Sequence, residues 1–114
     1  MAKKLDFNAL ERPVLELTLK DEARTVVRAT APTEELVERL TAAAGELKAV
    51  IDHGTGEAIK ALFELIADLM NCNLDGQVFT AEELRDKYGI KLYEATVFVA
   101  AYLEFIEEIK SAKN

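Results

Sequence analysis

Apolar and polar residues alternate over residues 13–20, with leucine at every second position from 15 to 19. This alternation predicts a β-strand with one buried face. After a polar turn at residues 21–23, the β-branched content of residues 24–30 favours a second strand, so the two segments are expected to form a hairpin. Leu5 to Asn8 is a candidate short third strand, and Pro32 disfavours continuation of the ladder.

Helical spacing begins after Pro32. Thr33 is a candidate helix cap, and apolar residues from Leu36 to Ile51 recur every three or four positions, which predicts a helix. Gly45 lies inside this segment, and glycine costs about 1 kcal/mol relative to alanine within a helix. Division into two shorter helices is therefore an open alternative, and residues 53–56 are expected to form a flexible connector.

Three more helices are expected in the second half of the chain. An apolar stripe over residues 59–70 predicts a helix that ends near Asn71, and residues 73–76 form a turn. Thr80 and Glu83 fit a capping box that opens a short helix up to residue 87, with Gly89 as its stop signal. The last helix is expected to run from about residue 91 to residue 110.

These elements predict an α+β fold that is predominantly helical. The expected architecture is an N-terminal β-hairpin packed on a bundle of about four helices. At 114 residues the chain has the size of a single domain, with residues 1–31 as the hairpin region and residues 32–114 as the helical region.

The last helix is apolar on nearly its whole circumference between Ala95 and Leu103. A single stripe facing the core does not account for this pattern, so the helix either lies at the centre of the protein or is covered by a partner. A symmetric homo-oligomer or a plain core would use the same side chains. The candidate partner-binding residues are Phe98, Tyr102, Phe105 and Ile109.

Charge narrows the class of partner. The chain has 14 basic and 21 acidic residues, a net charge of −7, which repels nucleic acid and anionic membrane surfaces. For the same reason a helix-turn-helix interpretation of residues 80–109 is disfavoured, because glutamates line the second helix.

The longest strongly apolar run without a charge has nine residues, well short of the roughly 20 needed to cross a bilayer. The N-terminus lacks an apolar signal core and the chain has one cysteine, Cys72, so a cytoplasmic location is expected.

Residues 71–82 match the twelve-residue calcium loop of an EF-hand at most positions, with Gly76 at the sharp turn. Two features argue against calcium binding: the first ligand is asparagine, and only two carboxylates are present. In addition, an Asp-Gly turn followed by a helix cap explains the same residues without a metal. A calcium-binding regulatory domain is therefore an alternative, and no cofactor is expected. The candidate metal ligands are Asn71, Asn73, Asp75, Gln77 through its carbonyl, and Glu82.

No residue pattern predicts catalysis. His53 is the only histidine, and the nearest hydroxyl nucleophile, Thr55, lies in a glycine-flanked loop. The chain is therefore expected to be non-enzymatic.

Six stretches, spread over nearly the whole chain, resemble small tail assembly chaperones encoded by phages and prophages of Gram-positive bacteria. The resemblance implies a non-enzymatic, largely helical and acidic protein that coats a tape-measure protein and helps tail-tube subunits assemble around it. The implied partners are other phage tail proteins in the host cytoplasm, and the family has no fixed set of functional residues. The stretches are Leu5-Asp6-Phe7-Asn8, Val14 to Leu19, Pro32 to Leu36, Asn71 to Gly76, Phe79 to Leu84 and Tyr102 to Ile109.

Overall fold

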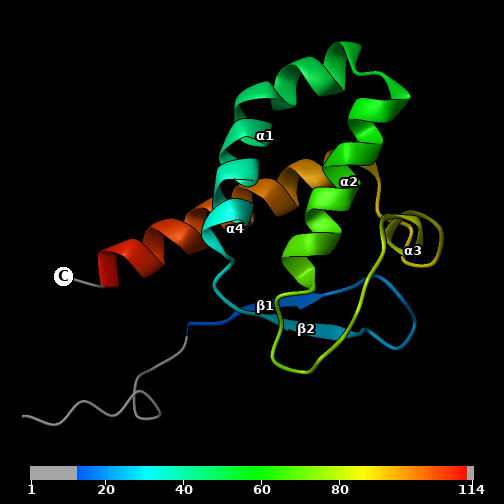
Figure 1. The fold of residues 1–114 in the computed structure, drawn as a ribbon. Helices are drawn as coiled ribbons and strands as arrows, with labels where there is room; N and C mark the ends of the chain where they lie inside the picture. Colours follow the sequence, from blue (N-terminus) through cyan, green and yellow to red (C-terminus); the bar gives the residue numbers. More distant parts are fainter. Residues whose placement is uncertain (1–12, 113–114) are drawn as a thin grey trace, which may run out of the picture.

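The computed structural model describes residues 13–112 and contains an antiparallel β-hairpin followed by four helices (Figure 1). This architecture confirms the predicted α+β class. The candidate third strand at residues 5–8 lies outside the described residues. The elements are β1 (Leu15–Thr18), β2 (Val26–Ala29), α1 (Glu34–His53), α2 (Gly56–Met70), α3 (Ala81–Asp86) and α4 (Leu92–Ala112).

Cross-strand pairing and a hydrogen-bonded turn stabilise the hairpin. Leu15 pairs with Ala29 and Leu17 with Val27, so the apolar side chains of both strands share one face. At the turn, the Asp21 carboxylate accepts a hydrogen bond from the backbone N–H of Thr25 at 2.8 Å. Both strands are shorter than predicted, and at their connected ends the reason is the turn: the Arg24 N–H donates to the carbonyl of Asp21 at 3.0 Å, and Arg24 has a positive φ of 49°.

The segment after α2 extends the sheet on the far side of β2. The backbone N–H of Thr30 donates to the carbonyl of Cys72 at 2.8 Å, and that of Leu74 donates to the carbonyl of Arg28 at 3.1 Å. An isolated bridge joins Ala29 to Asn73. These bonds cover the edge of β2 and fix the loop that connects α2 to α3.

Helices α1 and α2 form a helical hairpin that stands above the sheet (Figure 1). Gly45 does not divide α1, which is continuous from Glu34 to His53. The alternative of two helices is wrong: Gly45 itself is exposed, but Ala44 before it and Leu47 after it pack against the core, and this packing offsets the helix-propensity cost of glycine. The connection is shorter than predicted: the Thr55 hydroxyl accepts from the N–H of Ala58 at 3.1 Å, so α2 already begins at Gly56. Glycine is required at position 54, where a Cβ would lie 2.2 Å from the Val50 carbonyl oxygen.

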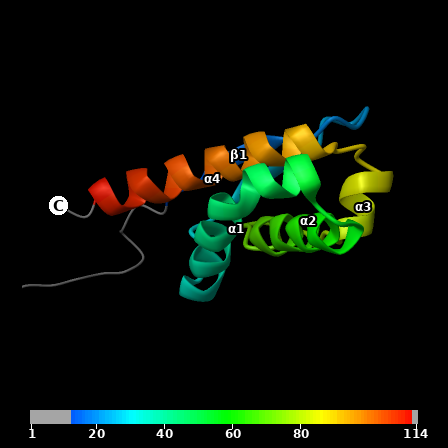
Figure 2. The same ribbon diagram turned by 90° about the horizontal axis from the view of Figure 1, so that it is seen from above.

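Helix α2 lies at the centre of the core. It contacts α1, α3, α4 and β2, and α4 crosses both α1 and α2 on one side (Figure 2). The start and stop signals of α3 are those that the sequence predicts. The Thr80 hydroxyl accepts from the N–H of Glu83 at the start, and Gly89 adopts a positive φ of 62° after the end. The fully buried large side chains are Val27, Leu40, Phe63, Ile66, Leu69, Met70, Leu84, Val99 and Tyr102.

Over residues 13–112, none of the helices combines the length and the hydrophobicity that a membrane-spanning segment requires.

One ion pair joins the sheet to the loop after α2 and has a predictable effect on acid stability. Arg28 forms a bidentate ion pair with the Asp75 carboxylate: Nε donates to Oδ2 at 3.1 Å, and Nη2 donates to Oδ1. Hydrogen bonding from Arg28 lowers the pKa of Asp75 below its usual value. Because the folded pKa is the lower one, the pair contributes stability above the unfolded pKa of about 4, and this contribution is lost as the pH falls through the folded pKa.

We therefore expect the melting temperature of Asp75→Asn to fall less than that of the wild type between about pH 5 and about pH 2. Circular dichroism melts across this range measure the difference. Glu104→Gln, which removes an exposed carboxylate on α4 that forms no ion pair with residues 13–112, is the control and should parallel the wild type. Parallel curves for Asp75→Asn and wild type would contradict the role of the pair.

Candidate functional site

Of the four candidate partner-binding residues on α4, two lie in the interior. Tyr102 is 0% exposed and Phe105 is 5% exposed. The Tyr102 hydroxyl donates a hydrogen bond to the carbonyl of Leu69 at 3.2 Å, and burial raises the pKa of this phenol. Phe98 stacks on Tyr102 with ring centroids 4.7 Å apart and is half-buried, as is Ile109. In this structure Tyr102 and Phe105 are core residues, so only Phe98 and Ile109 retain surface that a partner can contact.

A different stripe of α4 faces solvent. Tyr93 is 66% exposed and Val97 is 64% exposed, and Ala100 continues the stripe at the next turn. We call these three residues the α4 outer face. The sequence does not single these residues out, although their spacing of four and three residues is the same as that of Phe98, Tyr102 and Phe105. The periodicity shows that a stripe exists, but not which of two apolar stripes is turned outward.

An apolar groove adjoins the α4 outer face. It has a volume of about 210 Å³, and Val97 and Ala101 of α4 line it together with Leu17 of β1. At one end the Lys20 ammonium lies 2.7 Å from the Glu94 carboxylate, which links the end of β1 to the first turn of α4. The groove and the outer face therefore form one continuous apolar area.

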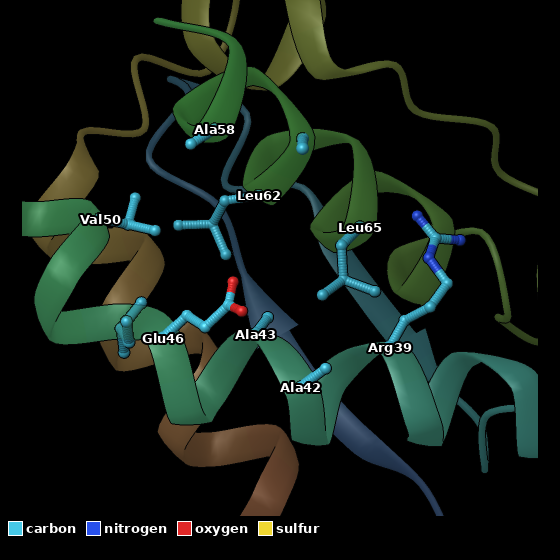
Figure 3. A pocket seen from close by; sticks show the side chains of 10 residues that line it. Arg39, Ala42, Ala43, Glu46, Val50, Ala58, Leu62 and Leu65 are labelled. Atoms are coloured by element: carbon cyan, nitrogen blue, oxygen red, sulfur yellow. The ribbon is translucent and has the colours of Figure 1, made fainter. Parts of the chain in front are cut away.

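A second groove lies between α1 and α2, and its volume is about 320 Å³ (Figure 3). Figure 3 shows Val50 of α1 and Leu62 and Leu65 of α2 pointing into it, with Arg39 and Glu46 at its α1 side. We call this the α1–α2 groove. It forms because alanines face the space from both helices and leave it unfilled. The alanines that line it are Ala42, Ala43, Ala58 and Ala61.

In the loop after α2, the side chain of Asn73 organises the backbone. Its Oδ1 accepts from the N–H groups of Asp75 and Gln77, both at 3.0 Å, and its Nδ2 donates to the carbonyls of Met70 and Gln77, both at 2.8 Å. Asn71 makes a similar pair of bonds with the backbone of Phe79. These bonds satisfy loop groups that a regular element would satisfy otherwise.

Four of the five candidate calcium ligands are engaged in other interactions, and the fifth, Glu82, lies in the following helix. Asn71 and Asn73 bond to the backbone, the Gln77 carbonyl accepts from Asn73, and Asp75 pairs with Arg28. Glu82 lies in the first turn of α3 and is exposed. Within the described part of the chain, no three His, Cys, Asp or Glu side chains gather as a metal-ligand group. The hydrogen bonds explain the conformation of this loop without an ion, and calcium binding stays a prediction.

The chain matches no known protein family, and comparison with curated proteins and with solved structures finds no similar protein.

Two tyrosines of α4 provide a matched test of core against surface. Tyr102→Ala removes a buried ring and is expected to lower the free energy of unfolding by about 3–5 kcal/mol. Tyr93→Ala removes an exposed ring of the same type and should change it by less than about 0.5 kcal/mol. Urea denaturation of both variants measures the two values, and similar losses would show that α4 is rotated relative to the placement described.

Asn73→Asp separates the structural from the calcium interpretation of the loop. The carboxylate loses both Nδ2–H donors and faces two carbonyls, so we expect a loss of about 1–3 kcal/mol. If residue 73 were a calcium ligand, the aspartate variant would instead bind calcium more tightly than the wild type, because added negative charge raises the calcium affinity of such loops. Thermal melts in excess EDTA and in millimolar calcium decide: a calcium-dependent rise in melting temperature, larger in the variant, would support the metal site.

Proposed function

We propose that this chain is a non-enzymatic tail assembly protein of a phage or prophage, which binds other tail proteins such as a tape-measure or tail-tube protein. The α4 outer face is the observation that carries the proposal. Tyr93 and Val97 adjoin the apolar groove lined by Leu17 and Ala101, and a contiguous exposed apolar patch is typical of surfaces that a partner covers. The whole-chain resemblance to tail assembly chaperones names the class of partner.

The charge of the protein is compatible with this role. A net charge of −7 keeps a protein with exposed apolar side chains soluble before its partner binds. Glu104 borders the outer face at its C-terminal end and forms no ion pair with residues 13–112, whereas Glu94 at the other end is paired with Lys20. Glu104 favours a partner surface with a basic residue beside its apolar centre.

A homo-oligomer is the second candidate function, because the α4 outer face and the adjoining groove would serve equally in a symmetric interface. A calcium-responsive regulatory domain that uses residues 71–82 is the third. Both are separable from tail assembly by experiment. Self-association appears in the protein alone, and a calcium response appears without any protein partner.

Val97→Asp tests the proposed surface. The substitution places a charge on the α4 outer face and is expected to weaken binding to the tape-measure or tail-tube protein of the same phage at least tenfold, about 1.4 kcal/mol. Isothermal titration with purified proteins measures the affinity, and the melting temperature should stay near that of the wild type.

Thr41→Asp adds the same charge at an exposed position of α1 and is the matched control. It should bind like the wild type. Absence of association between the wild-type protein and every tail protein tested would refute the assembly role, whereas equal binding by Val97→Asp and Thr41→Asp would move the interface away from the outer face. Sedimentation of the wild type alone tests the homo-oligomer.

A further inference from the structure

The α1–α2 groove has the dimensions and the lining of a helix-binding site. Its α1 wall runs from Arg39 to Val50, twelve residues whose rise of 1.5 Å per residue spans about 16.5 Å, or about three helical turns. Leu62 and Leu65 form a buried apolar floor, while Ala42 and Ala61 on opposite walls are exposed. The groove is therefore open at its mouth and apolar at its base.

Carboxylates border this apolar groove. Glu57, Glu64 and Asp68 are seven and four residues apart, so they share one face of α2 with Ala61, next to the groove. On the α1 side, Glu46 lines the groove directly. All four side chains are exposed.

Few cations offset these carboxylates. Arg39, the cation that lines the groove, already pairs with Asp68, with Nη1 and Oδ2 2.9 Å apart. Lys60, the one cation of α2, is three residues after Glu57 and four before Glu64, but it forms no ion pair with either and lines a separate depression between α2 and α3. Among residues 13–112, Glu46, Glu57 and Glu64 have no ion-pair partner. The rim therefore carries three carboxylates that form no direct ion pair with residues 13–112.

We infer that the α1–α2 groove binds one amphipathic helix of a partner protein, with an apolar stripe flanked by lysine or arginine. The apolar stripe would cover Leu62 and Leu65, and the basic flanks would meet Glu46, Glu57 and Glu64. This goes beyond the tail-assembly proposal, because it rests on the groove and its charges alone and concerns a surface separate from the α4 outer face.

A helix fits this groove better than an extended peptide. Both walls are helices, whose backbone groups are already bonded internally and present no edge for β-pairing. An extended peptide in the groove would leave its own N–H and C=O groups without partners against an apolar floor. A helical ligand satisfies its backbone internally and presents side chains at i, i+3, i+4 and i+7.

The test uses a synthetic fluorescent peptide of about 18 residues, five helical turns, with leucine at i, i+3, i+4 and i+7 positions and lysine on both flanks. A second peptide has glutamate in place of every lysine. Fluorescence anisotropy with the full chain is expected to show binding of the lysine peptide, weakening as salt is raised, and no binding of the glutamate peptide.

Ala61→Arg and Ala100→Arg are the matched variants. Both replace an exposed helical alanine with the same residue, but Ala61 lines the groove and Ala100 belongs to the α4 outer face. Ala61→Arg should bind the lysine peptide at least tenfold more weakly, and Ala100→Arg should bind like the wild type. Glu57→Gln combined with Glu64→Gln should reduce both the affinity and its salt dependence. Melting temperatures verify that each variant is folded.

Equal binding by Ala61→Arg and the wild type, equal binding of the two peptides, or no binding of the lysine peptide would each overturn the inference. These results leave the tail-assembly proposal standing, because they involve no tail protein. Conversely, the groove inference stands if the lysine peptide binds as expected but no tail protein does.

Discussion

Helix α2 has more apolar surface than any one neighbour can cover, and this constraint arranges the rest of the fold. Its residues from Leu62 to Met70 are nearly all buried, and α1, α3, α4 and β2 each contact it. The loop that follows α2 is fixed by Asn73 and bonds to the edge of β2, so the same helix also positions the sheet. The α1–α2 groove is the place where this cover is incomplete.

Most of the fold could be predicted from local chemistry. Thr33, Thr55 and Thr80 each cap a helix, and a cap needs only neighbouring residues, so helix starts are visible in the sequence. Thr55 is the exception, because its flanking glycines predict a flexible connector, whereas α2 begins at Gly56 directly after it. The continuity of α1 across Gly45 depends on contacts with α2 and α4, which local propensity does not contain.

The candidate sites were less predictable, for two physical reasons. An all-apolar helix has several equivalent stripes, and only tertiary packing decides that Tyr102 is buried while Tyr93 is exposed. In the loop, Asn73 and Asp75 occur in a calcium-like order, but oxygen atoms that could bind an ion serve the backbone and Arg28 equally well. The groove beside α4 joins residues 17–20 to residues 90–101, and the α1–α2 groove depends on how closely two helices pack, so no linear pattern indicates either one.

Burial decreases along α1, from Leu40, which is fully buried, to Leu47 and Val50, which are half-buried, and Ile51, which is 46% exposed. The end of the helical hairpin near Gly54 is therefore held by fewer apolar contacts than its base. Local opening costs least where the least surface is buried, and separation of α1 from α2 at this end leaves the core around α2 intact. The α1–α2 groove therefore widens at less cost at its Gly54 end than at its base.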